Sequence, residues 1–122
     1  MAKILVIEDD EWIRDLLEML LIDDGHQVIV AEDGVEGVQY FHQYHPHLVI
    51  TDIYMPNKDG LEVIMELLKF NAKQLIIAMS GGFRNISAHS HLDLASALGA
   101  RGILEKPFER NQLQALVESV LT

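Results

Sequence analysis

The strongest constraint on this fold is an alternation, repeated five times, between short apolar runs and longer segments with helical spacing. The short runs are rich in β-branched residues and are predicted to be strands: Lys3 to Ile7, Gln27 to Ala31, His47 to Thr51, Gln74 to Met79 and Arg101 to Glu105. Behind each run, apolar residues recur three or four positions apart, as on one face of a helix. Strands that alternate with helices form parallel sheets, because each crossover returns the chain to the same end.

The composition of the runs indicates their places in that sheet. The first, third and fourth runs are almost wholly apolar, which is typical of strands covered by helices on both faces. The second run is more mixed, which favours an edge position. The sequence therefore predicts an α/β fold: a doubly wound parallel sheet of five strands with five helices.

Length, charge and composition exclude several classes of protein. A chain of 122 residues suits one core, so residues 1–122 are expected to form one domain. No apolar run approaches the roughly 20 residues of a membrane-spanning helix, no export signal is recognisable, and cysteine is absent, which favours a cytoplasmic protein. Nine basic residues against 19 acidic ones, a net charge of −10, argue against direct binding of nucleic acid.

Polar residues gather where the predicted strands end. Glu8-Asp9-Asp10 follow the first run, Asp52 closes the third, Ser80-Gly81-Gly82 follow the fourth, and Lys106-Pro107 follow the fifth. In an open parallel sheet these ends share one edge, and ligands bind there. We therefore expect several carboxylates, a hydroxyl and an ammonium group to meet in one place.

These residue types suit phosphoryl transfer. Clustered carboxylates repel, so one would be protonated at neutral pH unless a cation joins them. Mg²⁺ prefers one or two carboxylates together with waters and phosphate oxygens. Lys106 and Ser80 can stabilise the oxygens of a transferring phosphoryl group. Asp52, on the middle strand, is then the natural nucleophile and would form an aspartyl phosphate.

The whole chain resembles the receiver domain of response regulators in two-component signalling. The resemblance rests on blocks in a fixed order: Ile4 to Asp10, Val49 to Pro56 with Asp59-Gly60, Ser80-Gly81, Gly99-Ala100, and Lys106-Pro107-Phe108. It implies a flavodoxin-like sheet with strand order 2-1-3-4-5.

The resemblance also implies a phosphoacceptor and a metal site. Asp52 would accept the phosphoryl group and contribute to the Mg²⁺ site. Asp9 would bind Mg²⁺ directly, and Glu8 directly or through water. The backbone carbonyl of Tyr54 would be a further metal ligand.

Two further residues receive roles from the resemblance. Ser80 would be the switch hydroxyl that moves onto the phosphoryl group, and Lys106 would pair with the phosphoryl oxygens. The Lys106-Pro107 peptide bond would be cis, an option specific to proline.

The chain departs from the family pattern in two places. The family usually has an aromatic residue three positions before its lysine, and here that position is Ile103. An aliphatic side chain cannot make the same inward gating movement. The stretch from Ser80 to Gly99 is also longer than usual, and its start, Gly81 to Arg84, is expected to be mobile.

The leading hypothesis is a switch in protein–protein interactions, controlled by a histidine kinase or a histidine phosphotransfer protein, and not a turnover enzyme. No effector domain follows Thr122 in this sequence, so the output is expected to pass through a partner. One alternative is a degenerate receiver that acts as a constitutive adaptor, which only Ile103 favours. Another is a small Mg²⁺-dependent phosphohydrolase, disfavoured because Tyr54 stands where such enzymes carry an aspartate.

Other conspicuous side chains are interpreted as structural. His42, His45 and His47 surround Pro46 in a connection away from the predicted site, and are taken as loop histidines and not as a metal cluster. Trp12, near the start of the first predicted helix, is expected to be partly packed.

Overall fold

The structure is a computed structural model that describes the backbone of residues 1–81 and 87–122, and the side chains of residues 1–81 and 93–122. The expected mobile start of the fourth crossover falls largely on residues 82–84, which lie outside the described residues.

Strands and helices alternate through the chain, which confirms the predicted α/β pattern. The strands are β1 (Lys3–Ile7), β2 (Gln27–Ala31), β3 (Leu48–Asp52), β4 (Leu75–Gly81) and β5 (Gly102–Lys106). The helices are α1 (Glu11–Asp23), α2 (Gly34–Tyr44), α3 (Gly60–Phe70), α4 (Ser87–Leu98) and α5 (Arg110–Leu121). The strands form one parallel sheet in the order β2-β1-β3-β4-β5, as the resemblance implied.

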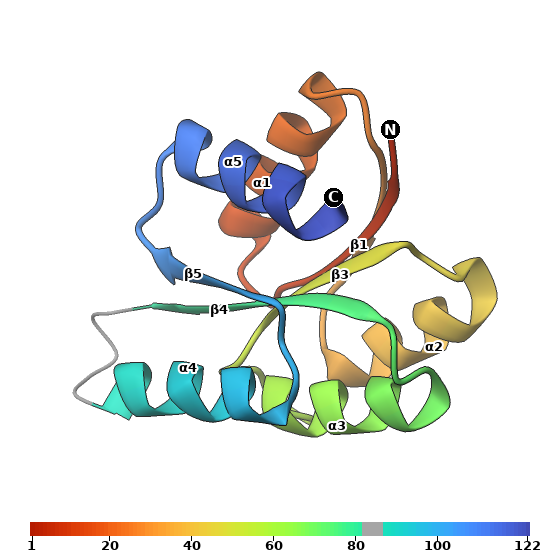
Figure 1. The fold of residues 1–122 in the computed structure, drawn as a ribbon, viewed down its shortest axis with the longest axis vertical. Coiled ribbons are helices and arrows are strands. Elements are labelled where there is room, and N and C mark those ends of the chain that lie inside the picture. Colours follow the sequence, from red (N-terminus) through yellow and green to blue (C-terminus); the bar gives the residue numbers. More distant parts are fainter. Residues whose placement is uncertain (82–86) are drawn as a thin grey trace.

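Helices cover both faces of this sheet. Helices α1 and α5 lie on one face, and α2, α3 and α4 lie on the other (Figure 1). Side chains alternate along β1, so that Leu5 and Ile7 join one core cluster while Ile4 and Val6 join the other. Strand β2 has half-buried residues and lies at an edge, as its mixed composition predicted.

Aspartates fix where three helices begin. The side chain of Asp10 accepts hydrogen bonds from the backbone N–H groups of Trp12 and Ile13 at the start of α1. Asp33 caps α2 and Asp59 caps α3 in the same way. Each carboxylate satisfies N–H groups that have no partner within the helix.

The last three strands end later than the apolar runs predicted. Residues Asp52, Ser80 and Lys106 belong to β3, β4 and β5, because backbone pairing continues beyond the last apolar side chain. The polar groups of the candidate site are therefore held by the sheet itself.

Candidate functional site

The carboxyl ends of four strands enclose a small cavity. Its volume is about 70 Å³, and its walls are Glu8, Asp9, Asp10, Ile13, Asp52, Tyr54, Gly81 and Lys106. They lie at the ends of β3, β4 and β5, in the turns that follow β1 and β3, and, for Ile13, in α1. The structure thus brings together the acidic residues and the lysine that the strand-end argument placed at one edge, whereas Ser80 is not one of the walls.

Three carboxyl groups meet in this cavity. Each of Glu8, Asp9 and Asp52 offers an oxygen within 4.8 Å of the other two. Glu8 and Asp52 are buried, with relative exposures of 0% and 3%. Among the side chains of residues 1–81 and 93–122, this is the only group of three or more acidic, histidine or cysteine residues close enough to hold a metal. His42, His45 and His47 accordingly form no such group.

Lys106 stands between two of the buried carboxylates. Its Nζ donates to Glu8 Oε1 at 2.7 Å and lies 3.4 Å from Asp52 Oδ2. The other oxygen of Asp52, Oδ1, accepts a hydrogen bond from the backbone N–H of Ile53 at 2.9 Å. Oδ2 is therefore the oxygen of Asp52 that faces the Lys106 ammonium group. The Lys106-Pro107 peptide bond that follows is cis, as the resemblance implied.

The turn after β1 is also held by hydrogen bonds. Glu8 Oε2 accepts from the backbone N–H of Asp10 at 3.1 Å. The guanidinium of Arg14 donates to the backbone carbonyl of Glu8 at 3.1 Å. Arg14 was missed in the sequence, because its helical spacing gave no sign that it reaches back to the end of a strand.

Burial sets the proton affinity of the two inner carboxyl groups. Burial, and after it the charge of Asp52, raise the pKa of Glu8 to about 7 against the opposing influence of Lys106. Burial likewise raises the pKa of Asp52, again against the influence of Lys106. Near neutral pH the cavity therefore holds more negative charge than its own lysine compensates, and it favours an additional cation.

A pH dependence of stability follows for the metal-free protein. The folded state holds the Glu8 proton up to about pH 7, against an ordinary pKa of 4.5. The folded state thus binds a proton that the unfolded chain has released, so the free energy of unfolding should fall as the pH rises from 5 to 8. Glu8 alone contributes up to about 3 kcal/mol to this fall.

Urea unfolding in a chelator-containing buffer at several pH values would measure this effect. The Glu8→Gln variant is the control, because its side chain cannot titrate. An identical pH profile in the variant and the parent protein would contradict the assignment.

Ser80 precedes Gly81, which lines the cavity, at the end of β4. Ser80 is 1% exposed, and its Oγ has no hydrogen-bond partner among the described residues. An unpaired buried hydroxyl costs on the order of 1–3 kcal/mol, so such a group usually serves a ligand or a second conformation. The sequence identified Ser80 by its position, but it could not show that the oxygen is unpaired.

The backbone of Gly60, at the start of α3, packs closely against the backbone of Asp52 and Ile53. The N–H of Gly60 donates to the carbonyl of Ile53 at 2.8 Å. A Cβ atom on Gly60 would lie 2.2 Å from the carbonyl oxygen of Asp52. Only glycine therefore lets α3 start directly against the end of β3, a constraint that the Asp59-Gly60 pair did not reveal in the sequence.

Two further residues named in the sequence lie near the site. Tyr54 is half-buried and lines the cavity. Ile103 is paired with Ala78 in the sheet and packs against the core cluster on the side of α2, α3 and α4.

The side chain of Trp12, expected to be partly packed, is instead 73% exposed, because it points away from the buried face of α1.

Comparison with known proteins places the chain in a family. Residues 4–118 match the model of the response regulator receiver domain. The chain is 35% identical over 123 residues to the chemotaxis protein CheY of Halobacterium salinarum, covering 100% of this chain and 99% of that protein. It is 39% identical over 119 residues to the probable transcriptional regulator ycf27 of Porphyridium aerugineum, covering 98% of this chain but 48% of that protein.

Solved structures agree. A response regulator receiver domain protein from Clostridium thermocellum superposes with a TM-score of 0.92 at 29% identity, covering 99% of this chain and 94% of that one. The receiver domain of NtrX from Brucella abortus gives 0.89 at 30% identity, covering 97% of each chain.

The fold and these matches define a signalling module of the two-component type. The chain belongs to the response regulator receiver family. It spans nearly all of the CheY relative but about half the length of the ycf27 relatives. Among the described residues, no helix has both the length and the apolar character needed to cross a bilayer.

Proposed function

We propose that Asp52 accepts a phosphoryl group from a phosphohistidine on a partner kinase or phosphotransfer protein, and that residues 1–122 act as one receiver domain in the cytoplasm. The observation that carries this proposal is the geometry of the cavity. Three carboxyl oxygens lie within 4.8 Å of one another, and the Lys106 ammonium group lies 3.4 Å from the free oxygen of Asp52.

The donor set fits Mg²⁺. The ion prefers oxygen ligands and takes few carboxylates, and the three carboxyl groups of Glu8, Asp9 and Asp52 lie close enough together to share one. Asp9, Asp52 and the Tyr54 carbonyl would bind it, with Glu8 binding directly or through water. When bound, Mg²⁺ supplies positive charge that screens the carboxylates from each other and from the phosphoryl oxygens.

The residues of the chain perform the transfer. Oδ2 of Asp52 attacks phosphorus in line, the new O–P bond forms as the N–P bond of phosphohistidine breaks, and the imidazole keeps the electron pair. Lys106 exchanges part of its contact with Glu8 for the phosphoryl oxygens. Attack of water on phosphorus later releases inorganic phosphate and restores the carboxylate, so the domain catalyses only its own modification.

Ser80 would couple phosphorylation to the surface. Its unpaired Oγ can donate to a phosphoryl oxygen once the group is present, which biases β4 and the crossover after it toward a second conformation. Ile103 takes the position where the family usually has an aromatic residue. The change at the surface would therefore come from altered packing and not from the inward movement of an aromatic side chain. A downstream protein would recognise the altered surface.

An apolar hollow on the surface of this protein, beside the cavity, would receive the phosphodonor. Trp12, Ile13, Leu16, Pro107 and Phe108 line it together with Lys106, and its volume is about 320 Å³. Apolar side chains around a reactive group exclude water when a partner docks. The exposed ring of Trp12 supports an assignment of this hollow to the donor protein.

Labelling with acetyl phosphate and intact-mass measurement tests the proposal. The parent protein should gain one phosphoryl group in the presence of Mg²⁺ and none with chelator. Asp52→Ala should gain none, whereas Asp33→Ala, a helix-cap change outside the cavity, should label normally. No adduct on the parent protein would favour the constitutive adaptor, and continuous hydrolysis of a small phosphate ester would favour the phosphohydrolase.

A further inference from the structure

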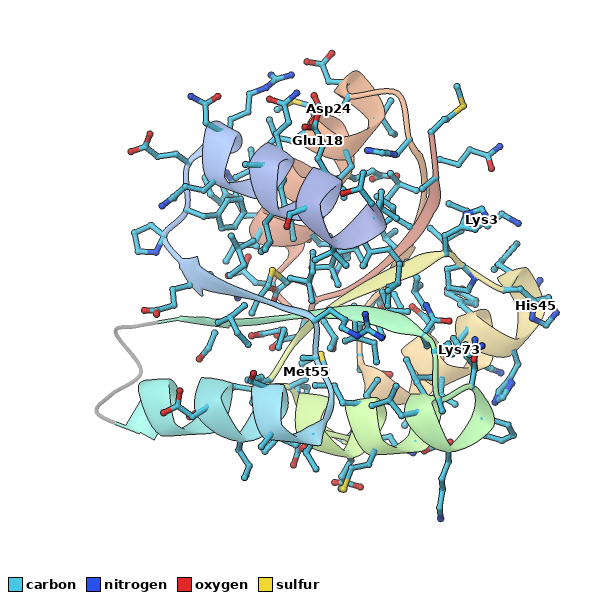
Figure 2. All side chains as sticks on the ribbon, viewed as in Figure 1. Lys3, Asp24, His45, Met55, Lys73 and Glu118 are labelled. Carbon is cyan, nitrogen blue, oxygen red and sulfur yellow. The ribbon has the colours of Figure 1, made fainter. Side chains whose placement is uncertain are left out.

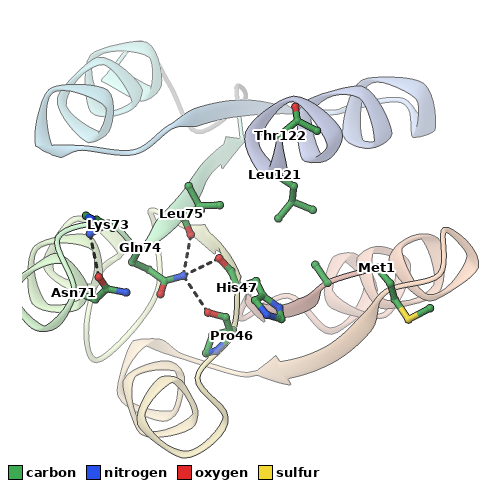
Figure 3. Close-up of a pocket in the computed structure, with 10 residues that line it drawn as sticks. Met1, Pro46, His47, Asn71, Lys73, Gln74, Leu75, Leu121 and Thr122 are labelled. Atoms are coloured by element: carbon green, nitrogen blue, oxygen red, sulfur yellow. Dashed lines mark hydrogen bonds between the residues drawn. The ribbon is translucent and has the colours of Figure 1, made fainter.

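A second recess crosses the opposite edge of the sheet, where the strands begin. Its central hollow has a volume of about 630 Å³ and includes Pro46, His47, Asn71, Lys73 and Gln74 on its walls. Gln74 lies on one side of the hollow, and Leu121 of α5 and the following Thr122 lie on the other (Figure 3). A volume of this size falls within the range of about 300–1,000 Å³ that is typical of ligand sites.

Two smaller hollows extend this recess in both directions. One shares Pro46, Asn71 and Gln74 with it and reaches Phe70. The other shares Leu75, Leu121 and Thr122 and reaches Arg101. We call the combined feature the amino-edge groove, running from Phe70 across Gln74 and Lys73 to Arg101. Its elongated form suits an extended segment better than a compact small molecule.

The charge of the amino-edge groove is opposite to that of the protein. The chain carries a net charge of −10, yet none of the residues that line the three hollows is aspartate or glutamate. Lys73 and Arg101 line it and are exposed, and His42, His45 and His47 lie along it. Lys3, His45 and Lys73 share one side of the molecule, away from the carboxyl ends of β4 and β5 (Figures 1 and 2).

The floor of the groove is already ordered. The side-chain Nε2 of Gln74, which is 6% exposed, donates to the carbonyls of Pro46, His47 and Leu75 at 3.2–3.3 Å. Nδ1 of His47 accepts the backbone N–H of Lys3 at 2.9 Å, so the ring proton of the neutral imidazole is on Nε2, which is a donor. A preformed floor lowers the conformational entropy that the groove itself loses when a partner binds.

Apolar surface accompanies the positive charge. The ring of Phe70 is 64% exposed and meets His42 edge-on, with the ring centroids 4.3 Å apart. Leu121 is half-buried on the far side of the central hollow. The groove therefore offers both cationic donors and apolar contacts along one path.

We propose that the amino-edge groove binds an extended acidic segment of a partner protein, in which carboxylates alternate with apolar side chains. Carboxylates would pair with Lys73 and Arg101 and accept from the His47 ring, while apolar side chains would cover Phe70 and Leu121. Nucleic acid and anionic membranes fit less well, because the remaining surface of an acidic protein repels an extended polyanion. The site is separate from the phosphoacceptor cavity, and the proposal does not depend on phosphorylation.

A designed peptide tests this. The probe is a fluorescein-labelled peptide of alternating glutamate and leucine, followed by fluorescence polarisation at low and high salt, with a lysine–leucine peptide as the comparison. The glutamate peptide should bind, more weakly at high salt, and should shift the NMR signals of the Gln74 side-chain amide. The double variant Lys73→Gln/Arg101→Gln should bind at least about tenfold more weakly.

The control is Lys58→Gln/Arg110→Gln, which removes the same charge from residues that pair with Glu66 and Asp23 outside the groove. It should change the affinity by less than about twofold. Thermal unfolding and acetyl phosphate labelling of both variants would show that the fold and Asp52 are intact. The proposal fails if the parent protein does not bind the glutamate peptide, if both double variants weaken binding equally, or if the lysine peptide shifts the Gln74 side-chain signals as strongly as the glutamate peptide.

Discussion

Replacing Lys106 by methionine should slow phosphorylation of Asp52 by about a hundredfold or more. Methionine keeps an unbranched side chain, one atom shorter, but removes the charge that lies 2.7 Å from Glu8 and 3.4 Å from Asp52. Lys106 opposes the burial that raises the pKa of both carboxyl groups, so its loss should raise these values further. Less of Asp52 would then be ionised, and the transferring phosphoryl oxygens would lack their cation.

The same substitution should destabilise the protein in a pH-dependent way. At pH 8 two buried carboxylates would lose their cationic partner, at a cost of about 3 kcal/mol, whereas at pH 5 protonation relieves most of that cost. Labelling rates at saturating Mg²⁺ and urea unfolding at both pH values would measure the two effects. Lys58→Met is the matched control, because Lys58 also pairs with a glutamate, Glu66, but lies outside the cavity. Equal labelling rates for the two variants would contradict the assigned role.

Replacing Gly60 by alanine should be the most destabilising single methyl addition considered, at about 3 kcal/mol or more. The added Cβ would lie 2.2 Å from the carbonyl oxygen of Asp52 and 2.7 Å from Cα of Ile53, and both are backbone atoms that cannot rotate away. Relief requires α3 to move from the end of β3, which displaces the phosphoacceptor. Urea unfolding and acetyl phosphate labelling should therefore both be impaired.

Gly25→Ala separates this collision from ordinary glycine effects. A Cβ on Gly25 meets nothing within 4 Å, but the residue has φ of +92°. Its replacement should cost about 1 kcal/mol from backbone strain and leave labelling unchanged. If Gly60→Ala were no worse than Gly25→Ala, the close approach would not be important for the fold.

The fold could be predicted because its main determinants are local. Apolar runs such as Lys3–Ile7 and the helical spacing between them specify alternating strands and helices, and that alternation favours a parallel sheet. The strand order was taken from the resemblance, since periodicity alone does not rank neighbours. The apolar runs end slightly before β3, β4 and β5 do, because backbone pairing continues through polar residues at which the hydropathy has already changed.

For the candidate site, the sequence predicted which residues come together but not how they contact one another. Strand-end positions identified Glu8, Asp52 and Lys106, since parallel strands end at one edge. The sequence could not predict the contacts of these groups: that Lys106 lies nearer Glu8 than Asp52, that Arg14 reaches the carbonyl of Glu8, and that Ser80 Oγ has no hydrogen-bond partner among the described residues. Such facts depend on three-dimensional distances, which residue types and spacing do not give.

The separation of charge between the two edges of the sheet has a kinetic consequence. Carboxylates crowd one edge, and the opposite edge lacks them along its groove, so the molecule carries an electric dipole moment in addition to its net charge. A cationic protein approaching from solution would exert a torque that turns the phosphoacceptor edge toward it before contact. Productive encounters would then be more frequent than random orientation allows, and added salt would reduce this advantage within the Debye length.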